Sequence, residues 1–304
     1  MTGQTLRQKI RFMAINHLYN NGLPFSETLA ITLRKQIERV SKNKASMILI
    51  DGYQGEGKTT LMVHIIDYIN KLHNLPPASL EMTHHPQISM GGLQFISNLK
   101  LCKEENLPIV GYDEAGDFNK RGFFSSFNQL MNSVFTKFRG FKIMVVVALP
   151  NFCLLDNWLY DNGVPRLGLH LKNRNIHDGD IYAYSLSQMN WIRYWYSKYP
   201  LGSKNVAYTK VHANFRGHFL NLPPEREKKL DILSTRSKLK ILTEQQVREE
   251  GLVNYDHIAT VTSHSIPTIR NWLSFLKIRP KVMVGRRAFF DKSVIEQIKQ
   301  KEWK

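Results

Sequence analysis

One short stretch, Gly52-Tyr53-Gln54-Gly55-Glu56-Gly57-Lys58-Thr59, constrains the fold of this chain more than any other. It follows the apolar run 47–50 and precedes the amphipathic stretch 61–69, which predicts a buried strand, a glycine-rich loop and a helix in that order. Glycines let successive backbone N–H groups turn toward an anion at a helix N-terminus, where the helix dipole also favours negative charge. A Gly-x-Gly turn can simply cap a helix. The complete pattern with both flanking periodicities instead favours a site for a nucleoside triphosphate.

The residue types in this loop predict separate roles. Lys58 is expected to reach the β- and γ-phosphates, and the Thr59 hydroxyl is expected to be a ligand of Mg²⁺. ATP and Mg²⁺ are therefore the expected cofactors. The expected nucleotide-binding residues are Gly52, Gln54, Gly55, Glu56, Gly57, Lys58, Thr59 and Thr60.

A second motif, Ile109-Val110-Gly111-Tyr112-Asp113-Glu114, is an apolar strand that ends in two acids. Such a strand puts Asp113 at the carboxyl edge of a parallel sheet, beside the glycine loop, where it can hold Mg²⁺. Glu114 can then polarise the attacking water as a general base. Two acids alone would more often be a solvated strand end, but beside Lys58 and Thr59 they predict hydrolysis of the nucleotide rather than binding alone.

The charge of the chain is concentrated at its two ends. The net charge is +17; residues 1–46 carry eight Lys or Arg against two acids, and residues 225–304 carry 17 against 10. This pattern favours a polyanionic partner, with nucleic acid preferred over membrane because no basic amphipathic anchor is present. A merely solubilising surface is the alternative. Cys102 and Cys153 have no metal-ligand spacing, and the sequence shows neither a signal peptide nor a membrane span, so we expect a cytoplasmic protein.

Strand and helix patterns alternate through the middle of the chain. The expected strands are 47–51, 108–113 and 141–149, and the expected helices are 59–72 and 124–138, after two short helices at 6–19 and 26–40. The alternation predicts an α/β fold with a mostly parallel sheet and helices on both faces. The expected domains are an N-terminal helical segment 1–46, an ATPase domain 47–222, a basic linker 223–240 and a DNA-binding domain 241–304.

Antiparallel signals follow Asn151. The runs 167–172 and 181–187 flank an Asp-Gly step, which predicts a hairpin. The next aromatic residues could stack on unpaired bases, but large rings are more often buried, so we interpret them as core; they are Trp191, Tyr194, Trp195, Tyr196 and Tyr199. His84-His85 has no acid or Cys partner at ligand spacing and is interpreted as a polar loop rather than a metal site.

The last 64 residues have their own pattern. Helices are expected at 252–261 and, with Ser265 as N-cap and Pro267 in the first turn, at 265–276. A two-stranded wing over 282–290 and a helix 292–301 capped by Asp291 complete the pattern. The expected DNA contacts are Thr268, Arg270, Asn271 and Lys277 around the second helix, with Arg286 and Arg287 on the wing. A small protein-binding module is the alternative interpretation.

These motifs carry two resemblances. Residues 47–187 resemble P-loop ATPases of the additional-strand, catalytic-glutamate division, most closely the FtsK/HerA group and its Zot-like branch. The resemblance rests on the glycine loop, Tyr112-Asp113-Glu114-Ala115-Gly116, Thr136-Lys137-Phe138-Arg139-Gly140 and the strand that ends in Pro150-Asn151. The C-terminal pattern resembles the winged helix-turn-helix of the MerR and excisionase type, carried by residues 268–273 and 285–289.

The first resemblance implies further roles. Asn151 would be the polar sensor at the end of its strand, orienting the water or the γ-phosphate. Related ATPases form rings, generally hexamers, in which an arginine of one subunit completes the site of its neighbour. Arg139, Arg166 and Arg174 are the candidates for that arginine.

Three functions stay open at this point. The leading one is an ATP-hydrolysing motor that translocates or remodels double-stranded DNA, for which the pairing of domains suggests a virus or plasmid as source and genome packaging, transfer or segregation as role. The second is an ATP-controlled DNA-binding switch, such as a transposition adaptor, a loader or a partition ATPase. The third is a signalling ATPase whose C-terminal domain binds protein, which salt-insensitive or absent DNA binding would favour.

Overall fold

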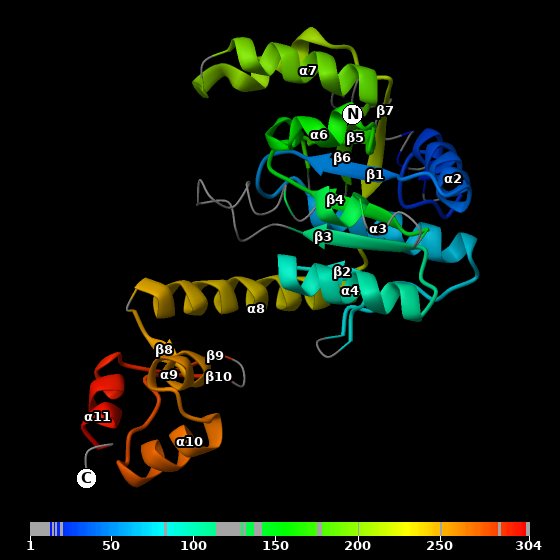
Figure 1. Ribbon diagram of the computed structural model, residues 1–304. Helices are drawn as coiled ribbons and strands as arrows, with labels where there is room; N and C mark the ends of the chain where they lie inside the picture. The colour runs from blue at the N-terminus through cyan, green and yellow to red at the C-terminus, as the bar shows by residue number, and fades with distance from the viewer. Residues whose placement is uncertain are drawn as a thin grey trace, which may run out of the picture. The chain divides into compact units, whose positions relative to one another are not determined.

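A computed structural model describes residues 13, 15, 17, 18, 21–81, 84–113, 129, 132–136, 142–174, 178–199, 201–249, 251–284 and 287–301 (Figure 1). By its internal contacts the chain divides into two compact units, residues 1–234 and 235–304. Helix α8 (Pro224–Glu249) contains the boundary between them.

The first unit is built on a seven-stranded sheet in the order β2-β3-β4-β1-β5-β6-β7 (Figure 1). The strands are β1 (Met47–Asp51), β2 (Ile88–Ser89), β3 (Ile109–Asp113), β4 (Met144–Ala148), β5 (Pro165–Lys172), β6 (Asp178–Ser185) and β7 (Phe215–Leu220). The pairs from β2 through β5 are parallel, and β5-β6 and β6-β7 are antiparallel. The predicted mostly parallel sheet and the hairpin after residue 165 are therefore confirmed.

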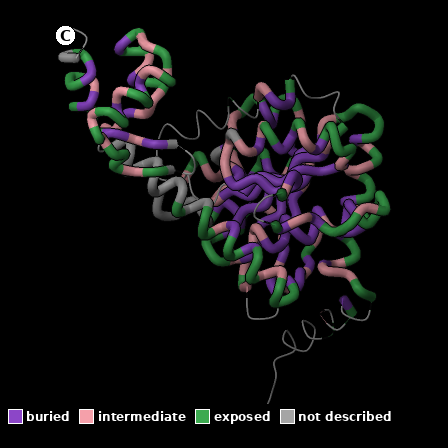
Figure 2. The backbone as a smooth tube through the Cα atoms, turned by 90° about the horizontal axis from the view of Figure 1, so that it is seen from below, coloured by how far each residue is buried: buried purple, intermediate pink, exposed green. Residues whose placement is uncertain are grey.

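Helices cover both faces of this sheet. They are α2 (Glu27–Ser41), α3 (Lys58–Leu72), α4 (Gly92–Glu104), α6 (Asn157–Asp161) and α7 (Leu186–Lys198), with short 3-10 helices η2 (Phe152–Leu154) and η3 (Leu201–Lys210). Alternate residues of β1 enter two different cores: Ile48 and Ile50 pack with α2 and α3, and Met47 and Leu49 pack with residues of α4 and α7. Because both faces are covered, β1, β3 and β4 are buried along their whole length. Figure 2 shows this buried backbone in the middle of the unit, with exposed residues around it.

Most local expectations agree with these elements, and two differ. The helix predicted at 26–40 is α2, and the described part of the helix predicted at 124–138, residues 129 and 132–136, is helical. The strand predicted at 181–187 ends at Ser185, because Ser185 and Gln188 form a capping box that starts α7. The prediction that the aromatic residues are buried was wrong for two of them. On α7, Trp191 is 58% exposed and Tyr194 is 49% exposed, whereas Trp195 and Tyr196 pack against the core.

The second unit contains three short helices and a small sheet. The helices are α9 (Tyr255–Thr262), α10 (Ile266–Phe275) and α11 (Ser293–Lys301), and the strands β8 (Val253–Asn254), β9 (Val282–Val284) and β10 (Arg287–Phe290) form an antiparallel sheet in the order β8-β10-β9. Ser263, with a positive φ of 57°, ends α9, and Ser265 caps α10 by accepting from Thr268 N. Asp291 accepts from Ser293 N at 3.0 Å. The Ser265 cap, the second and third helices and the hairpin strands agree with the prediction. The helix predicted at 252–261 begins only at Tyr255, because Val253 and Asn254 form β8, which was not predicted, and Asn254 caps the helix.

Buried His64 makes the stability of the first unit depend on pH. His64 lies in α3 and its Nε2 is 2.8 Å from the Leu220 carbonyl oxygen. Burial lowers the pKa of His64 from 6.5 to about 4. Below pH 6.5 the unfolded chain therefore binds more protons than the folded one, so stability is lost as the pH falls toward 4.

We expect this histidine to reduce the free energy of unfolding by about 2 kcal/mol between pH 7 and pH 5. Urea unfolding of the protein and of His64→Gln at both pH values measures it. The variant should lose less stability than the parent over this interval, and an identical loss in both would contradict the assignment.

Among the described residues, no helix has the length and the apolar character needed to cross a bilayer.

Candidate active site

Three glycines shape the loop that joins β1 to α3. Gly52, Gly55 and Gly57 have φ angles of +146°, +86° and +83°, a region that other residues adopt only with strain. A Cβ atom on Gly52 would lie 2.9 Å from the Leu171 carbonyl oxygen, and one on Gly57 would lie 3.0 Å from the Phe219 ring. The loop therefore requires glycine for its backbone conformation at all three positions and for close packing at two of them.

Lys58 begins α3 and its side chain returns over the loop. Its Nζ donates to the carbonyl oxygens of Gly52 and Tyr53, both at 2.8 Å. Partial burial lowers the pKa of Lys58, and the nearby carboxylates of Asp113, Asp51 and Glu56 act in the opposite direction. The ammonium group is thus held inside the curve of the loop, where an anion would meet it.

Thr59 and Asp113 meet at the carboxyl edge of the sheet. The Thr59 hydroxyl donates to Asp113 Oδ2 at 2.6 Å, although the two residues lie in α3 and at the end of β3. The strand register explains this: Asp113 pairs with Ala148, and Ala148 pairs with Ile50, so β3 and β1 end in the same row. Asp113 is 3% exposed. The expectation that the glycine loop and this acid lie at one edge of the sheet agrees with the structure.

A hydroxyl and a carboxylate oxygen in contact form a donor set of the kind that Mg²⁺ prefers. With the three positive-φ glycines and the Lys58 ammonium beside them, the residues present fit a magnesium-bound triphosphate. Of the other expected nucleotide-binding residues, Gln54 is exposed and Thr60 is buried in the first turn of α3. Glu114, Arg139 and Arg286 lie outside the described residues.

Asn151 follows β4, the neighbour of β1, and so lies near the same edge. Its Oδ1 accepts from Cys153 N at 2.8 Å and caps η2. The same oxygen is 3.1 Å from the Tyr208 hydroxyl. Asn151 is therefore oriented by two contacts within its own chain.

The structure separates the two described arginine candidates. Arg166 is the second residue of β5, where the neighbouring residues pair with Met47 and Ile48, so it lies at the amino edge, opposite the glycine loop. Arg174 follows β5 at the carboxyl edge. Its N–H donates to Glu56 Oε2 at 2.9 Å, and its Nη2 is 2.8 Å from Glu227 Oε1 of α8. Arg174 thus lies beside the glycine loop of its own chain.

Sequence reasoning missed a buried polar cluster directly before the loop. Asp51 is fully buried; its Oδ1 is 2.8 Å from His170 Nδ1, and its Oδ2 accepts from Phe152 N at 3.2 Å and from the Tyr208 hydroxyl. One signal was available: Asp51 and His170 are the polar residues at the end of one apolar strand and inside another. Nothing in the sequence indicated Tyr208.

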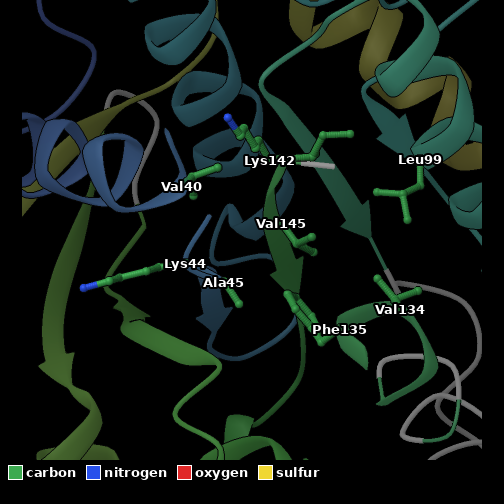
Figure 3. A pocket seen from close by; sticks show the side chains of 9 residues that line it. Val40, Lys44, Ala45, Leu99, Val134, Phe135, Lys142 and Val145 are labelled. Carbon is green, nitrogen blue, oxygen red and sulfur yellow. The ribbon is translucent and has the colours of Figure 1, made fainter. Parts of the chain in front are cut away.

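A small pocket lies elsewhere on the first unit, near the amino ends of β1 and β4 (Figure 3). Its labelled lining residues are Val40, Lys44, Ala45, Leu99, Val134, Phe135, Lys142 and Val145. Among the described residues this lining is mostly apolar, and its ionisable side chains are those of Lys44 and Lys142.

In the second unit, the exposed side of α10 carries Arg270 and Asn271, while Ile269 and Leu273 are buried on its other side. Thr268 is partly buried, and its hydroxyl is 2.8 Å from that of Ser265. Lys277 follows the helix and is exposed. Arg287 lies on β10. Three of the expected DNA contacts, Arg270, Asn271 and Lys277, are thus available to a partner.

The sequence matches no protein-family model and no curated protein. Two similar solved structures are the N-terminal domain of zonular occludens toxin from Neisseria meningitidis and a KaiC-like protein from Pyrococcus horikoshii. The first is 16% identical, with 46% of this chain and 84% of that chain covered and a TM-score of 0.30. The second is 12% identical, with 46% and 78% covered and a TM-score of 0.30. Both likenesses are weak, so what this chain does has to be inferred from the site itself.

Proposed function

We propose that this protein is a Mg²⁺-dependent ATPase with a P-loop fold. The observation that carries the proposal is the contact of Thr59 with Asp113 at 2.6 Å beside a glycine loop that encloses Lys58. Backbone N–H groups of the loop and the Lys58 ammonium would hold the phosphates. Thr59 and Asp113 would hold Mg²⁺, which when bound supplies positive charge to the phosphate oxygens. Glu114 remains the proposed general base, and Asn151 the proposed sensor of water or γ-phosphate.

Arg174 is proposed to act in its own site. Its backbone N–H is bonded to Glu56 of the loop, and its side chain lies 3.1 Å from where a Cβ of Gly57 would be. An arginine so close to its own loop can stabilise phosphate charge in cis, as arginine fingers do in some nucleotide hydrolases. Arg139 and Arg166 remain the proposed residues for a trans contact in a homo-oligomer, which we propose to be a hexameric ring of the FtsK/HerA or Zot-like kind.

The proposed partner is double-stranded DNA. The second unit has two helices joined by a tight turn, a basic hairpin and an exposed Arg270-Asn271 pair, which supports a winged helix-turn-helix. Residues 225–304 carry a net positive charge, which favours phosphate contacts. Together the two sites support a motor that translocates or remodels DNA.

A DNA-binding switch is the second candidate, and one observation favours it. Glu227, which pairs with Arg174 beside the glycine loop, belongs to α8, and the same helix continues past the boundary at residue 235. A change at the nucleotide site could thus be passed along one helix. Long duplex DNA should stimulate steady-state turnover strongly for a motor, whereas a switch should hydrolyse slowly and assemble on DNA.

DNA binding can be tested with Arg270→Ala. We expect the variant to bind a duplex at least about 5-fold more weakly, because one charged contact is lost, and to show less stimulation of ATP turnover. Fluorescence anisotropy over a series of salt concentrations measures binding; affinity should fall steeply as salt rises.

Arg236→Ala, which removes an exposed arginine from α8, is the matched control and should bind DNA like the parent. Equal loss in both variants would indicate a general charge effect. Absence of salt-sensitive DNA binding in the parent would contradict the DNA proposal and favour a protein partner.

A further inference from the structure

The buried Asp51 carboxylate joins the carboxyl ends of two adjacent strands to the segment that follows a third. Asp51 ends β1, His170 is its direct register partner on β5, and Phe152 N belongs to the segment after β4. By strand alternation Asp51 and His170 both face the core that contains Phe152 and Tyr208. One carboxylate therefore ties together the carboxyl ends of β4, β1 and β5, immediately before the first glycine of the loop.

Tyr208, from η3, closes this cluster from outside the sheet. Its ring stacks on His170 with 4.0 Å between ring centroids and an interplanar angle of 19°. Its hydroxyl contacts Asp51 Oδ2 and lies 3.1 Å from Asn151 Oδ1. Tyr208 is 5% exposed, so the contact is sheltered from water. The phenol thus bridges the Asp51 cluster and the Asn151 side chain.

The single proton of the Tyr208 hydroxyl limits how this group can bond to its two neighbouring oxygens. A phenol has one proton to donate, and both neighbouring oxygens are acceptors. Asn151 Oδ1 also accepts from Cys153 N at 2.8 Å, which fixes which end of the amide faces Tyr208. Donation to Asp51 leaves Asn151 held by Cys153 N alone, and donation to Asn151 holds its amide against the cluster. The position of one proton therefore decides how firmly Asn151 is oriented.

We propose that Tyr208, whose ring is held by stacking on His170, is a positioning residue that orients Asn151 at the edge of the nucleotide site by donating its hydroxyl proton to Asn151 Oδ1. The inference rests on the proposed ATPase function and assigns that site a residue from η3, far from its motifs in sequence. Phosphate binding by the loop N–H groups and Lys58 does not involve the phenol. Removing the hydroxyl should therefore lower the rate of hydrolysis without weakening nucleotide binding.

Tyr208→Phe is the decisive variant because it keeps the ring on His170 and deletes only the hydroxyl. We expect kcat for ATP to fall about 10-fold or more, since a misplaced positioning group is costly to the rate. KM and the dissociation constant of a fluorescent ATP analogue should stay within about 2-fold of the parent. Tyr184→Phe, on a neighbouring buried ring 6.3 Å away between centroids, is the matched control and should keep parental kcat.

A double-mutant cycle tests whether Tyr208 acts through Asn151. In an Asn151→Ala background, Tyr208→Phe should cause no further loss of kcat, because the side chain it orients is already gone. Full independent loss in the double variant, parental kcat in Tyr208→Phe, or a parallel loss of nucleotide binding would each overturn the inference. If the parent protein itself hydrolyses no ATP, the proposed function fails and the inference fails with it. If the parent hydrolyses ATP and Tyr208→Phe has the same kcat as the parent, the inference alone is refuted.

Discussion

Replacing Lys58 with alanine should lower ATP turnover by at least about 100-fold, the cost expected when a preorganised cationic donor to the transferring phosphate is removed. The Lys58 ammonium is already held within the loop by the carbonyl oxygens of Gly52 and Tyr53 at 2.8 Å. It would therefore exchange those contacts for phosphate oxygens with little reorganisation. Phosphate release at saturating ATP, with and without duplex DNA, measures the effect.

Two further variants sharpen this experiment. Lys71→Ala removes an exposed lysine from the last turn of the same helix and should keep parental turnover. Glu114→Gln should also lose turnover but still bind nucleotide, because an amide cannot act as a general base. Parental turnover in Lys58→Ala would show that the glycine loop is not the active site. Parental turnover in Glu114→Gln would remove only Glu114 as the base.

The part of the site that could be predicted from sequence is the part built from local patterns. The order of strand, glycine loop and helix around Lys58 needs only neighbouring residues. To predict that Asp113 lies beside Thr59, one more rule was needed: the carboxyl ends of parallel strands meet at one edge of the sheet. The structure agrees, because the Thr59 hydroxyl lies 2.6 Å from Asp113 Oδ2.

What could not be predicted depends on which strands are neighbours. Asp51 meets His170 only because β5 lies beside β1, and Arg174 is beside the glycine loop for the same reason. A polar residue in each of two mostly apolar strands does not reveal that the strands pair. Helical spacing likewise groups Trp191 with Tyr194 but does not tell which face of α7 the sheet covers, and so their exposure was missed.

The second large effect concerns the pair at the base of the loop. His170→Ala should lower the free energy of unfolding of the first unit by about 3–5 kcal/mol, because it leaves a ring-sized cavity in the core and deprives Oδ1 of the buried Asp51 carboxylate of its partner, while Oδ2 keeps Phe152 N and the Tyr208 hydroxyl. Asp51 is fully buried and His170 is 5% exposed, so water cannot replace the lost contact without entering the core. Hydrogen exchange of the β1 and β5 amides, together with urea unfolding at pH 7, measures the loss within this unit.

The matched control is His212→Ala, at an exposed position of the same unit, which should change stability by less than about 0.5 kcal/mol. Adding Asp51→Asn to His170→Ala should recover part of the loss, since a neutral amide is cheaper to bury than an unpaired carboxylate. This recovery separates the electrostatic cost from the cavity left by the imidazole ring, which both variants share. If His170→Ala costs less than about 1 kcal/mol, or if the second substitution only adds to the loss, the pair does not hold the carboxyl ends of β1 and β5 together.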